Sequence, residues 1–216
     1  MPSPQKFKAI YDALAEEGAE DVISIHISYS LSGIVDVAHI AARETTSARL
    51  AVLDSHQLSQ GTGFLVETAA RLANSGAALH DILVALQDQI KRTHTVASLN
   101  TLEFLRRSSM MSAAMSTIGE LLQIKPFLKM YDGKPEAERI RTRKKALQRL
   151  VNLIRAHAPY EKAAFLHSLA EEETRSVIKA VKDLLSGGVV WLEQVTPVLG
   201  AHIGPGVVGF SDISKA

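Results

Sequence analysis

The chain has 216 residues, 46% of them hydrophobic, so it can form one large or two small domains with an apolar core. Lys and Arg number 24 against 23 Asp and Glu, which argues against nucleic acid as a partner because nucleic-acid binders usually carry a basic surplus. The absence of cysteine excludes disulfides, thiolate metal sites and cysteine catalysis. We find no signal peptide and no apolar stretch of ~20 residues, and we expect a cytoplasmic protein without stable membrane insertion.

The predicted elements of the first half alternate between helices and strands. Apolar spacing predicts helices over residues 4–17, 33–43, 61–73 and 79–91, and strands over 21–27 and 50–53. Ser3 and Pro4 are a typical helix start, and Gly18 is a typical helix end. Because strands alternate with helices here, we expect a parallel sheet with crossover helices.

This alternation is lost in the second half. Strands are predicted over residues 96–99, 124–130, 162–169 and 188–195, and helices over 101–107, 111–122, 142–157 and 171–185. Asp132 and Gly133 are a turn pair that predicts a hairpin, and the apolar, glycine-rich stretch 198–210 is expected to be a tail. We therefore expect an α/β protein of two domains. Residues 1–97 would carry a mostly parallel sheet, and residues 98–216 an α+β domain with antiparallel strands.

The most informative segment is the serine turn, residues 28–33, which reads S-Y-S-L-S-G between a predicted strand and a predicted helix. A helix N-terminus presents unpaired N–H groups and partial positive charge, so it can serve as an anion-binding site. The hydroxyls of Ser28, Ser30 and Ser32 add donors, and the turn contains no Lys or Arg. A carboxylate therefore fits better than a triphosphate. The alternative is a hydroxyl turn that caps the helix without a ligand.

Three further segments allow both a functional and a structural interpretation. His202 lies in a glycine-rich stretch, 200–206, where it could donate to an anion or simply belong to a turn. Asp54 and Ser55 end a predicted strand, either as a second polar wall of the site or as a helix cap. The basic run 139–145 either contacts a phosphate or a partner protein, or is a solvated helix face.

No metalloprotease, P-loop or dinucleotide-binding motif occurs, so neither a metal site nor a nucleotide cofactor is expected. His26 shares a predicted strand face with Ser24 and Ser28, which allows a serine–histidine nucleophile pair. The G-x-S-x-G elbow of serine hydrolases is missing, so a structural histidine is the preferred interpretation.

Several short motifs resemble the DegV family of bacterial fatty-acid-binding proteins, in the same order and over nearly the whole chain. They are P-S-P at 2–4 with Phe7, I-S at 27–28 with L-S-G at 31–33, V-L-D-S at 52–55, L-L-Q-I-K-P at 121–126 with D-G at 132–133, R-T at 141–142 with K-K-A at 144–146, and H-I-G-P-G at 202–206. Each motif alone is weak, and their order makes the set specific.

The resemblance implies two α/β-type domains with the acyl chain of a long-chain fatty acid buried between them, and no catalysis. Ser32 would bind the carboxylate together with its neighbours in the turn, Ser28, Ser30 and Gly33, and His202 would contact it from the second side. Family members present the bound acid to a separate ATP-using fatty acid kinase, so that kinase is an expected partner. No cofactor other than the bound acid is implied.

The chain departs from the family pattern at three places. The family's segment before the P-S motif, including a Thr-Ser pair, does not precede Met1. Either the start codon is misassigned or the first domain is shortened, and a shortened domain would expose a sheet edge that a homodimer could cover. The family's G-G-R-I-S reads S-S-M-M-S at 108–112, so Met110 replaces an arginine suited to a phosphate and weakens the kinase expectation. Tyr29 and Ile34 replace the serine and threonine of the family's turn.

Two other functions stay open. A degenerate family member would serve as an interaction module, and its interdomain cleft would be empty or collapsed. A small acyl hydrolase would use Ser28 or Ser32 as the nucleophile and His26 or His202 as the base.

Overall fold

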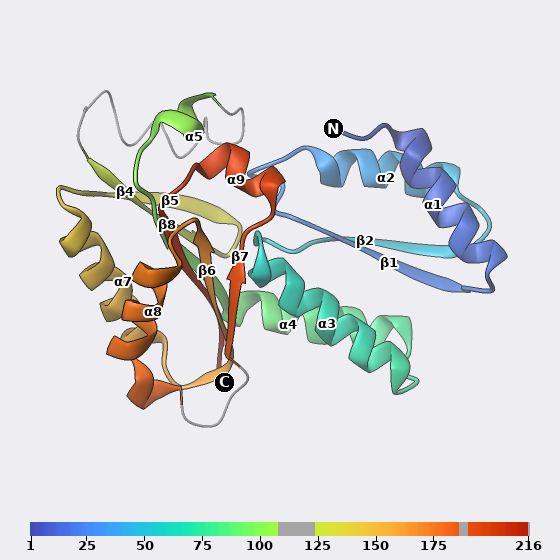
Figure 1. Ribbon diagram of the computed structural model, residues 1–216. Coiled ribbons are helices and arrows are strands. Elements are labelled where there is room, and N and C mark those ends of the chain that lie inside the picture. The colour runs from blue at the N-terminus through green and yellow to red at the C-terminus, as the bar shows by residue number, and fades with distance from the viewer. Residues whose placement is uncertain (108–123, 186–189, 216) are drawn as a thin grey trace.

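The computed structural model describes residues 1–107, 124–185 and 190–215. The chain forms a first half around a two-stranded sheet and a second half around a six-stranded sheet (Figure 1). The first sheet is parallel and the second contains antiparallel strands, which confirms the predicted α/β class. None of the described helices is both long enough and apolar enough to cross a membrane.

Helices cover both faces of the first sheet. The elements are α1 (Pro4–Glu16), β1 (Asp21–His26), α2 (Ile34–Glu44), β2 (Arg49–Asp54), α3 (Gln60–Asn74) and α4 (Leu79–Arg92). Side chains of β1 alternate, so that Val22 packs with α1 and α2 while Ile23 and Ile25 pack with α3 and α4. All six elements were predicted to within one residue at each end, because each helix has one apolar face and each strand is short and apolar.

The second half contains more strands than the sequence predicted. Its elements are β3 (Thr93–Ser98), α5 (Glu103–Arg107), β4 (Lys125–Tyr131), β5 (Lys134–Ile140), α7 (Arg143–His157), β6 (Tyr160–Ser168), α8 (Glu171–Ala180), a 3₁₀ turn (Lys182–Leu184), β7 (Val190–Gln194), α9 (Pro197–Ile203) and β8 (Val207–Ser214). The strand order is β5-β4-β3-β8-β6-β7. Helices α7 and α8 pack on one face of this sheet through Phe127, Phe165 and Phe210 (Figure 1).

The predicted tail is wrong, because it contains α9 and β8, and β8 is an inner strand that pairs with β3 and β6. Seven consecutive residues of β8 are buried, so it lacks the alternation by which a strand is recognised in sequence. The helix predicted over 171–185 ends at Ala180, because Val181 leaves the helical conformation at φ −121° and a 3₁₀ turn follows. β3 begins at Thr93, directly after α4, rather than at residue 96.

The structure does not test the predictions for residues 110–122 or the predicted domain boundary. The helix predicted over 111–122 and the position Met110 lie outside the described residues. The domain boundary at 97–98 stays a prediction; it falls within β3, which pairs on both sides with strands of the second half.

Helix α3 lies between the two sheets. Its residues Leu65 and Ala69 pack with α4 and with the first sheet. Its fully buried Phe64 packs instead with Ala164, Ile213 and Trp191 of the second sheet. One helix thus contributes to the cores of both halves.

An ion-pair network fixes β5 to α7. Arg149 Nε and Nη2 each donate to the Glu138 carboxylate at 2.8 Å, and Lys129 Nζ lies 3.1 Å from it. The hydrogen bonds from Arg149, opposed by burial and assisted by Lys129, lower the pKa of Glu138 from 4.5 to about 2. The ionised carboxylate therefore stabilises the folded protein.

We expect acid to weaken this network. A carboxylate with a depressed pKa stabilises the fold above its unfolded pKa of about 4.3 and loses that effect as pH falls through its folded pKa. Glu138→Gln should lower the free energy of unfolding by about 1 kcal/mol at neutral pH, and by less at each step towards pH ~2. Urea unfolding followed by circular dichroism checks this, with Glu136→Gln as the control that spares the Arg149 pair. A difference from wild type that does not shrink on acidification would contradict it.

Candidate functional site

A mostly apolar cavity lies on the face of the six-stranded sheet opposite α7 and α8. Its empty volume is about 640 Å³, a figure that includes the part open to solvent. The lining residues from β3, β4, β6 and β8 include Ala97, Leu128, Leu166 and Gly209, and α9 contributes Leu199 and Ile203. Leu31, Leu58 and Ser59 of the first half complete the lining. The cavity therefore lies between the two halves.

Two small residues create this space. Ala97 of β3 and Gly209 of β8 are cross-strand partners in the middle of the sheet. A Cβ added at Gly209 would lie 3.5 Å from the Cβ atoms of Ala97 and Leu166 and 3.3 Å from Val96 O. Larger residues at these two positions would fill the floor of the cavity.

The charged groups of the lining are already paired. Lys129 Nζ lies 2.8 Å from the Glu136 carboxylate and 3.1 Å from Glu138. Burial lowers the pKa of Lys129, but the hydrogen bonds to these two carboxylates together raise it by more. The pKa of Lys129 is therefore above its ordinary value. This cation is thus committed to its own partners, and an anionic ligand needs other donors.

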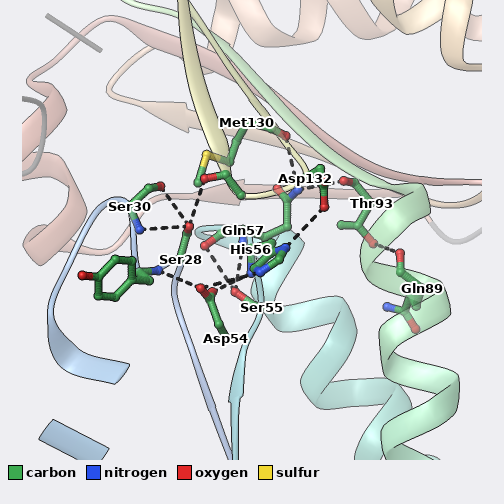
Figure 2. A network of polar contacts seen from close by, with 12 residues as sticks. Ser28, Ser30, Asp54, Ser55, His56, Gln57, Gln89, Thr93, Met130 and Asp132 are labelled. Atoms are coloured by element: carbon green, nitrogen blue, oxygen red, sulfur yellow. Dashed lines mark hydrogen bonds and ion pairs between the residues drawn. The ribbon is translucent and has the colours of Figure 1, made fainter. Parts of the chain in front are cut away.

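The serine turn borders the cavity through Leu31. Ser28 is only 1% exposed, and its Oγ lies 2.9 Å from Ser30 Oγ. The Ser28 hydroxyl donates to Gly133 O at 3.4 Å and accepts a hydrogen bond from Ser30 N at 3.3 Å (Figure 2). The hydroxyl of Ser28 therefore holds the turn together.

Ser32 and the start of α2 are differently placed. Ser32 is half-buried, and its hydroxyl makes no hydrogen bond with any residue that the structure describes. α2 begins at Ile34 with Gly33 as its N-cap, and Val37 is the first residue whose N–H bonds back, to Gly33 O at 3.3 Å. The N–H groups of Ile34 and Val35 thus find no backbone acceptor in the described part of the chain, as is usual for a first helical turn.

The serine turn meets two other segments, the loop after β2 (residues 55–59) and the β4–β5 hairpin turn (Figure 2). Gly133 N donates to His56 O at 3.2 Å, and His56 Nδ1 lies 3.4 Å from Asp132 Oδ1. Asp54 accepts from Tyr29 N at 3.1 Å and from His56 N at 2.8 Å. The Asp54 carboxylate therefore orders the two loops. Because it only accepts hydrogen bonds, it is not a donor to a bound anion.

Gln57 joins this assembly to the second sheet. Its side chain is fully buried, and Nε2 donates to Thr93 O at 2.7 Å and to Met130 O at 3.2 Å. Its backbone O accepts from Ser28 N at 2.7 Å. His56 and Ser59, on either side, have positive φ values of 54° and 50°, a strained conformation for these residues that is common near binding sites.

No sequence motif marks this loop, and Gln57 was not predicted as a site residue. The available signal was Gly61, at the start of α3, where only a glycine fits. An added Cβ there would lie 2.7 Å from Thr95 Oγ1 and 3.0 Å from Gln57 Oε1. This close approach indicates that the loop is packed tightly on β3.

His202 lies on α9, half-buried, and its side chain has no hydrogen-bond or ion-pair partner among the described residues. It follows Leu199 by three positions and precedes Ile203, so it is adjacent to the face of α9 that lines the cavity. The neighbouring glycines are explained by the turn itself. Gly204 ends α9 at φ 75°, and a Cβ there would overlap the Phe104 ring.

Arg143, in the predicted basic run, is a half-buried residue whose guanidinium is fully engaged in hydrogen bonds. It donates to Ser98 O at 3.3 Å, to Gly206 O at 2.7 Å and to the Glu173 carboxylate. The hydrogen bond from Arg143 lowers the pKa of Glu173, against the effect of its burial. Lys144 and Lys145 are exposed, so this run is partly a clamp on the 204–206 turn and partly a solvated helix face.

His26 contacts Ser24 rather than Ser28. Ser24 Oγ lies 2.7 Å from His26 Nε2 and accepts from Tyr11 OH at 2.7 Å. Burial, with the charge of His39, lowers the pKa of His26. Within the described ranges, neither Ser28 nor Ser32 has a hydrogen bond to His26 or His202.

Comparison with known proteins gives a consistent result. The profile of the uncharacterised proteins of the DegV family matches residues 1–215. A DegV domain-containing protein of Deinococcus radiodurans is 34% identical over 213 residues, which are 97% of this chain and 75% of the relative. The fatty-acid-binding DegV family protein of Thermus thermophilus superposes with a TM-score of 0.86 at 34% identity, over 100% of this chain and 78% of that one. DegV of Bacillus subtilis, a fatty acid binding protein, has a TM-score of 0.88 at 28% identity over the same shares.

The contribution of Gln57 can be measured by Gln57→Met, which keeps the size of the side chain and removes its amide. Two buried carbonyls then lose a donor, and we expect the free energy of unfolding to fall by about 1–3 kcal/mol. Gln89→Met is the matched control, since Gln89 is also buried and its Nε2 has no partner in the described part of the chain. Equal losses in the two variants, measured by urea unfolding, would argue against the assigned role.

Proposed function

The chain belongs to the DegV family, and we propose that it binds a long-chain fatty acid in the cavity between its two halves, with the carboxylate at the serine turn. The observation that carries this proposal is the apolar cavity with Leu31 of the serine turn in its lining. The resemblance of the fold to proteins described as fatty acid binding supports it.

The cavity suits an acyl chain better than a polar ligand. Apart from the paired Lys129 and Glu136, its polar lining residues are Ser59 and Thr95. Thr95 Oγ1 is hydrogen-bonded to Ser211 Oγ at 2.9 Å, so it has little hydrogen-bonding capacity left for a ligand. Burial of each methylene gives about 0.8 kcal/mol, so a long chain can supply most of the binding energy.

The carboxylate needs several donors, because an unpaired buried charge is very costly. Ser32 supplies a hydroxyl that is not otherwise used, and the first turn of α2 supplies N–H groups at the positive end of a helix dipole. Ser28 and Ser30 would act indirectly, by holding the turn in shape through their mutual hydrogen bond. His202 on α9 would approach the carboxylate from the second half.

The two rival functions receive less support. A degenerate module would have a collapsed cleft, whereas an apolar cavity lined by residues of both halves is present. A hydrolase built on Ser28 or Ser32 needs a histidine at hydrogen-bond distance, and none of the described histidines is there. We therefore propose a non-catalytic, cytoplasmic carrier. Presentation of the bound acid to a fatty acid kinase and assembly as a homodimer remain parts of this proposal.

The direct test is denaturing mass spectrometry of lipid extracted from the purified protein, followed by reloading of the stripped protein with saturated and unsaturated acids. We expect a co-purifying long-chain acid, or stoichiometric loading. Failure to recover or load any long-chain acid would overturn the proposed function.

Ser32→Ala tests the head-group site. Loss of one donor to a buried carboxylate costs about 1–3 kcal/mol, so the Kd should rise about 5- to 150-fold. Displacement of a fluorescent fatty acid from delipidated protein measures this. Ser176→Ala, on the exposed side of α8, is the matched control and should leave the Kd unchanged. An unaltered Kd for Ser32→Ala would remove Ser32 from the site.

Ala97→Phe tests the chain site. The added ring would occupy the floor of the cavity, and loss of space for even two methylenes, at about 0.8 kcal/mol each, weakens binding about tenfold. Because the ring fills empty space, the melting temperature of the ligand-free protein should not fall. Ala156→Phe, at an exposed position of α7, is the control for a surface phenylalanine. Full binding by Ala97→Phe would place the chain elsewhere.

A further inference from the structure

Three side chains far apart in the sequence converge on the face of the six-stranded sheet opposite the cavity. His94 lies on β3, Asp212 lies on β8, and His157 is the last residue of α7. One potential ligand atom from each lies within 4.8 Å of the other two. We propose that His94, His157 and Asp212 bind a divalent transition-metal ion of the zinc class.

The donor atoms already have nearly the spacing of a coordination sphere. Asp212 Oδ2 lies 3.1 Å from His94 Nδ1, and Asp212 Oδ1 lies 3.0 Å from His157 Nδ1. Ligand atoms placed tetrahedrally at ~2.1 Å from zinc are about 3.4 Å apart. The two imidazoles contact different oxygens of Asp212, so an ion held by all three residues would bind between the rings, either to both oxygens or to one after a ring turns. Two imidazoles and a carboxylate are a common zinc ligand set that leaves a fourth position for water.

The charge of Asp212 gives an independent argument. Its side chain is 0% exposed, and His94 and His157 are its only ion-pair partners in the part of the chain that the structure describes. A buried carboxylate without a compensating positive charge is strongly unfavourable. A dication held by the two rings and this carboxylate would supply both a compensating charge and direct ligation.

The surroundings position the ligands. Tyr131 OH lies 3.1 Å from His157 Nε2, and Ser214 Oγ donates to Asp212 Oδ2 at 3.1 Å. When Nδ1 of His157 binds an ion, its proton is on Nε2, which donates to the Tyr131 oxygen; metal-binding histidines are usually held this way. The side chains of His94 and His157 are 21% and 14% exposed, so an ion can reach them from solvent.

The proposal does not depend on fatty acid binding, since the cluster and the cavity lie on opposite faces of the sheet. An ion there would join the end of α7 to β3 and β8, and it would stabilise the second half. The readout is therefore metal affinity and thermal stability, with no lipid present.

The experiment uses tag-free full-length protein, stripped with a chelator and titrated with Zn²⁺ by calorimetry and with Co²⁺ by visible absorption. We expect one ion per chain, a higher melting temperature with Zn²⁺, and a cobalt spectrum typical of nitrogen and oxygen ligands. His94→Ala and Asp212→Asn should each weaken the affinity about tenfold or more. His80→Ala, an exposed histidine on α4, is the matched control and should bind as wild type does.

Folding of each variant is checked by circular dichroism. If Asp212→Asn does not fold, His94→Ala carries the test, because its side chain is at the accessible edge of the cluster. Absence of saturable Zn²⁺ and Co²⁺ binding by the wild-type protein overturns the proposal. So does equal uptake by a folded His94→Ala, His157→Ala double variant, because the ion would then be bound elsewhere.

Discussion

The side-chain amide of Gln57 joins the two halves of this molecule at the point where the serine turn, the loop after β2 and the β4–β5 hairpin meet. Its Nε2 group satisfies two buried carbonyls of the second half, and its backbone carbonyl accepts from Ser28 in the first. Buried polar groups of this kind are costly when unpaired, so the three segments can pack together only while this residue bridges them. The cavity depends on that packing, because residues of the same segments form part of its wall.

The cavity itself follows from side-chain size and charge pairing. Ala97 and Gly209 leave the middle of a sheet uncovered where larger side chains would close it. The ammonium of Lys129 is paired with Glu136 and Glu138 on the side of the sheet that faces α7, so the cavity face carries little charge. A chain of methylenes loses little by entering such a space and gains its whole hydrophobic transfer energy. In the proposed complex the polar demand is confined to one end of the ligand, the carboxylate.

The local spacing of apolar residues was enough to predict the elements of the first half and the position of the serine turn, because amphipathic helices and short apolar strands are recognisable in sequence. It failed at β8, whose continuous burial is a property of the finished sheet. It also could not rank the serines of the turn, since only the fold reveals that Ser28 is bonded to Ser30 while Ser32 is not. Gln57 and the cluster of His94, His157 and Asp212 belong to no sequence motif, because strand pairing and helix packing bring these residues to their partners.

The direct passage from α4 into β3 has a mechanical consequence. Arg92 ends the helix and Thr93 begins the strand, with no intervening linker, and Thr93 Oγ1 donates to Gln89 O at 2.8 Å across the junction. This junction is the single covalent crossing between the halves, and it has no slack for them to swing about. Any swing of one half about this junction would have to break that hydrogen bond or unwind the last turn of α4.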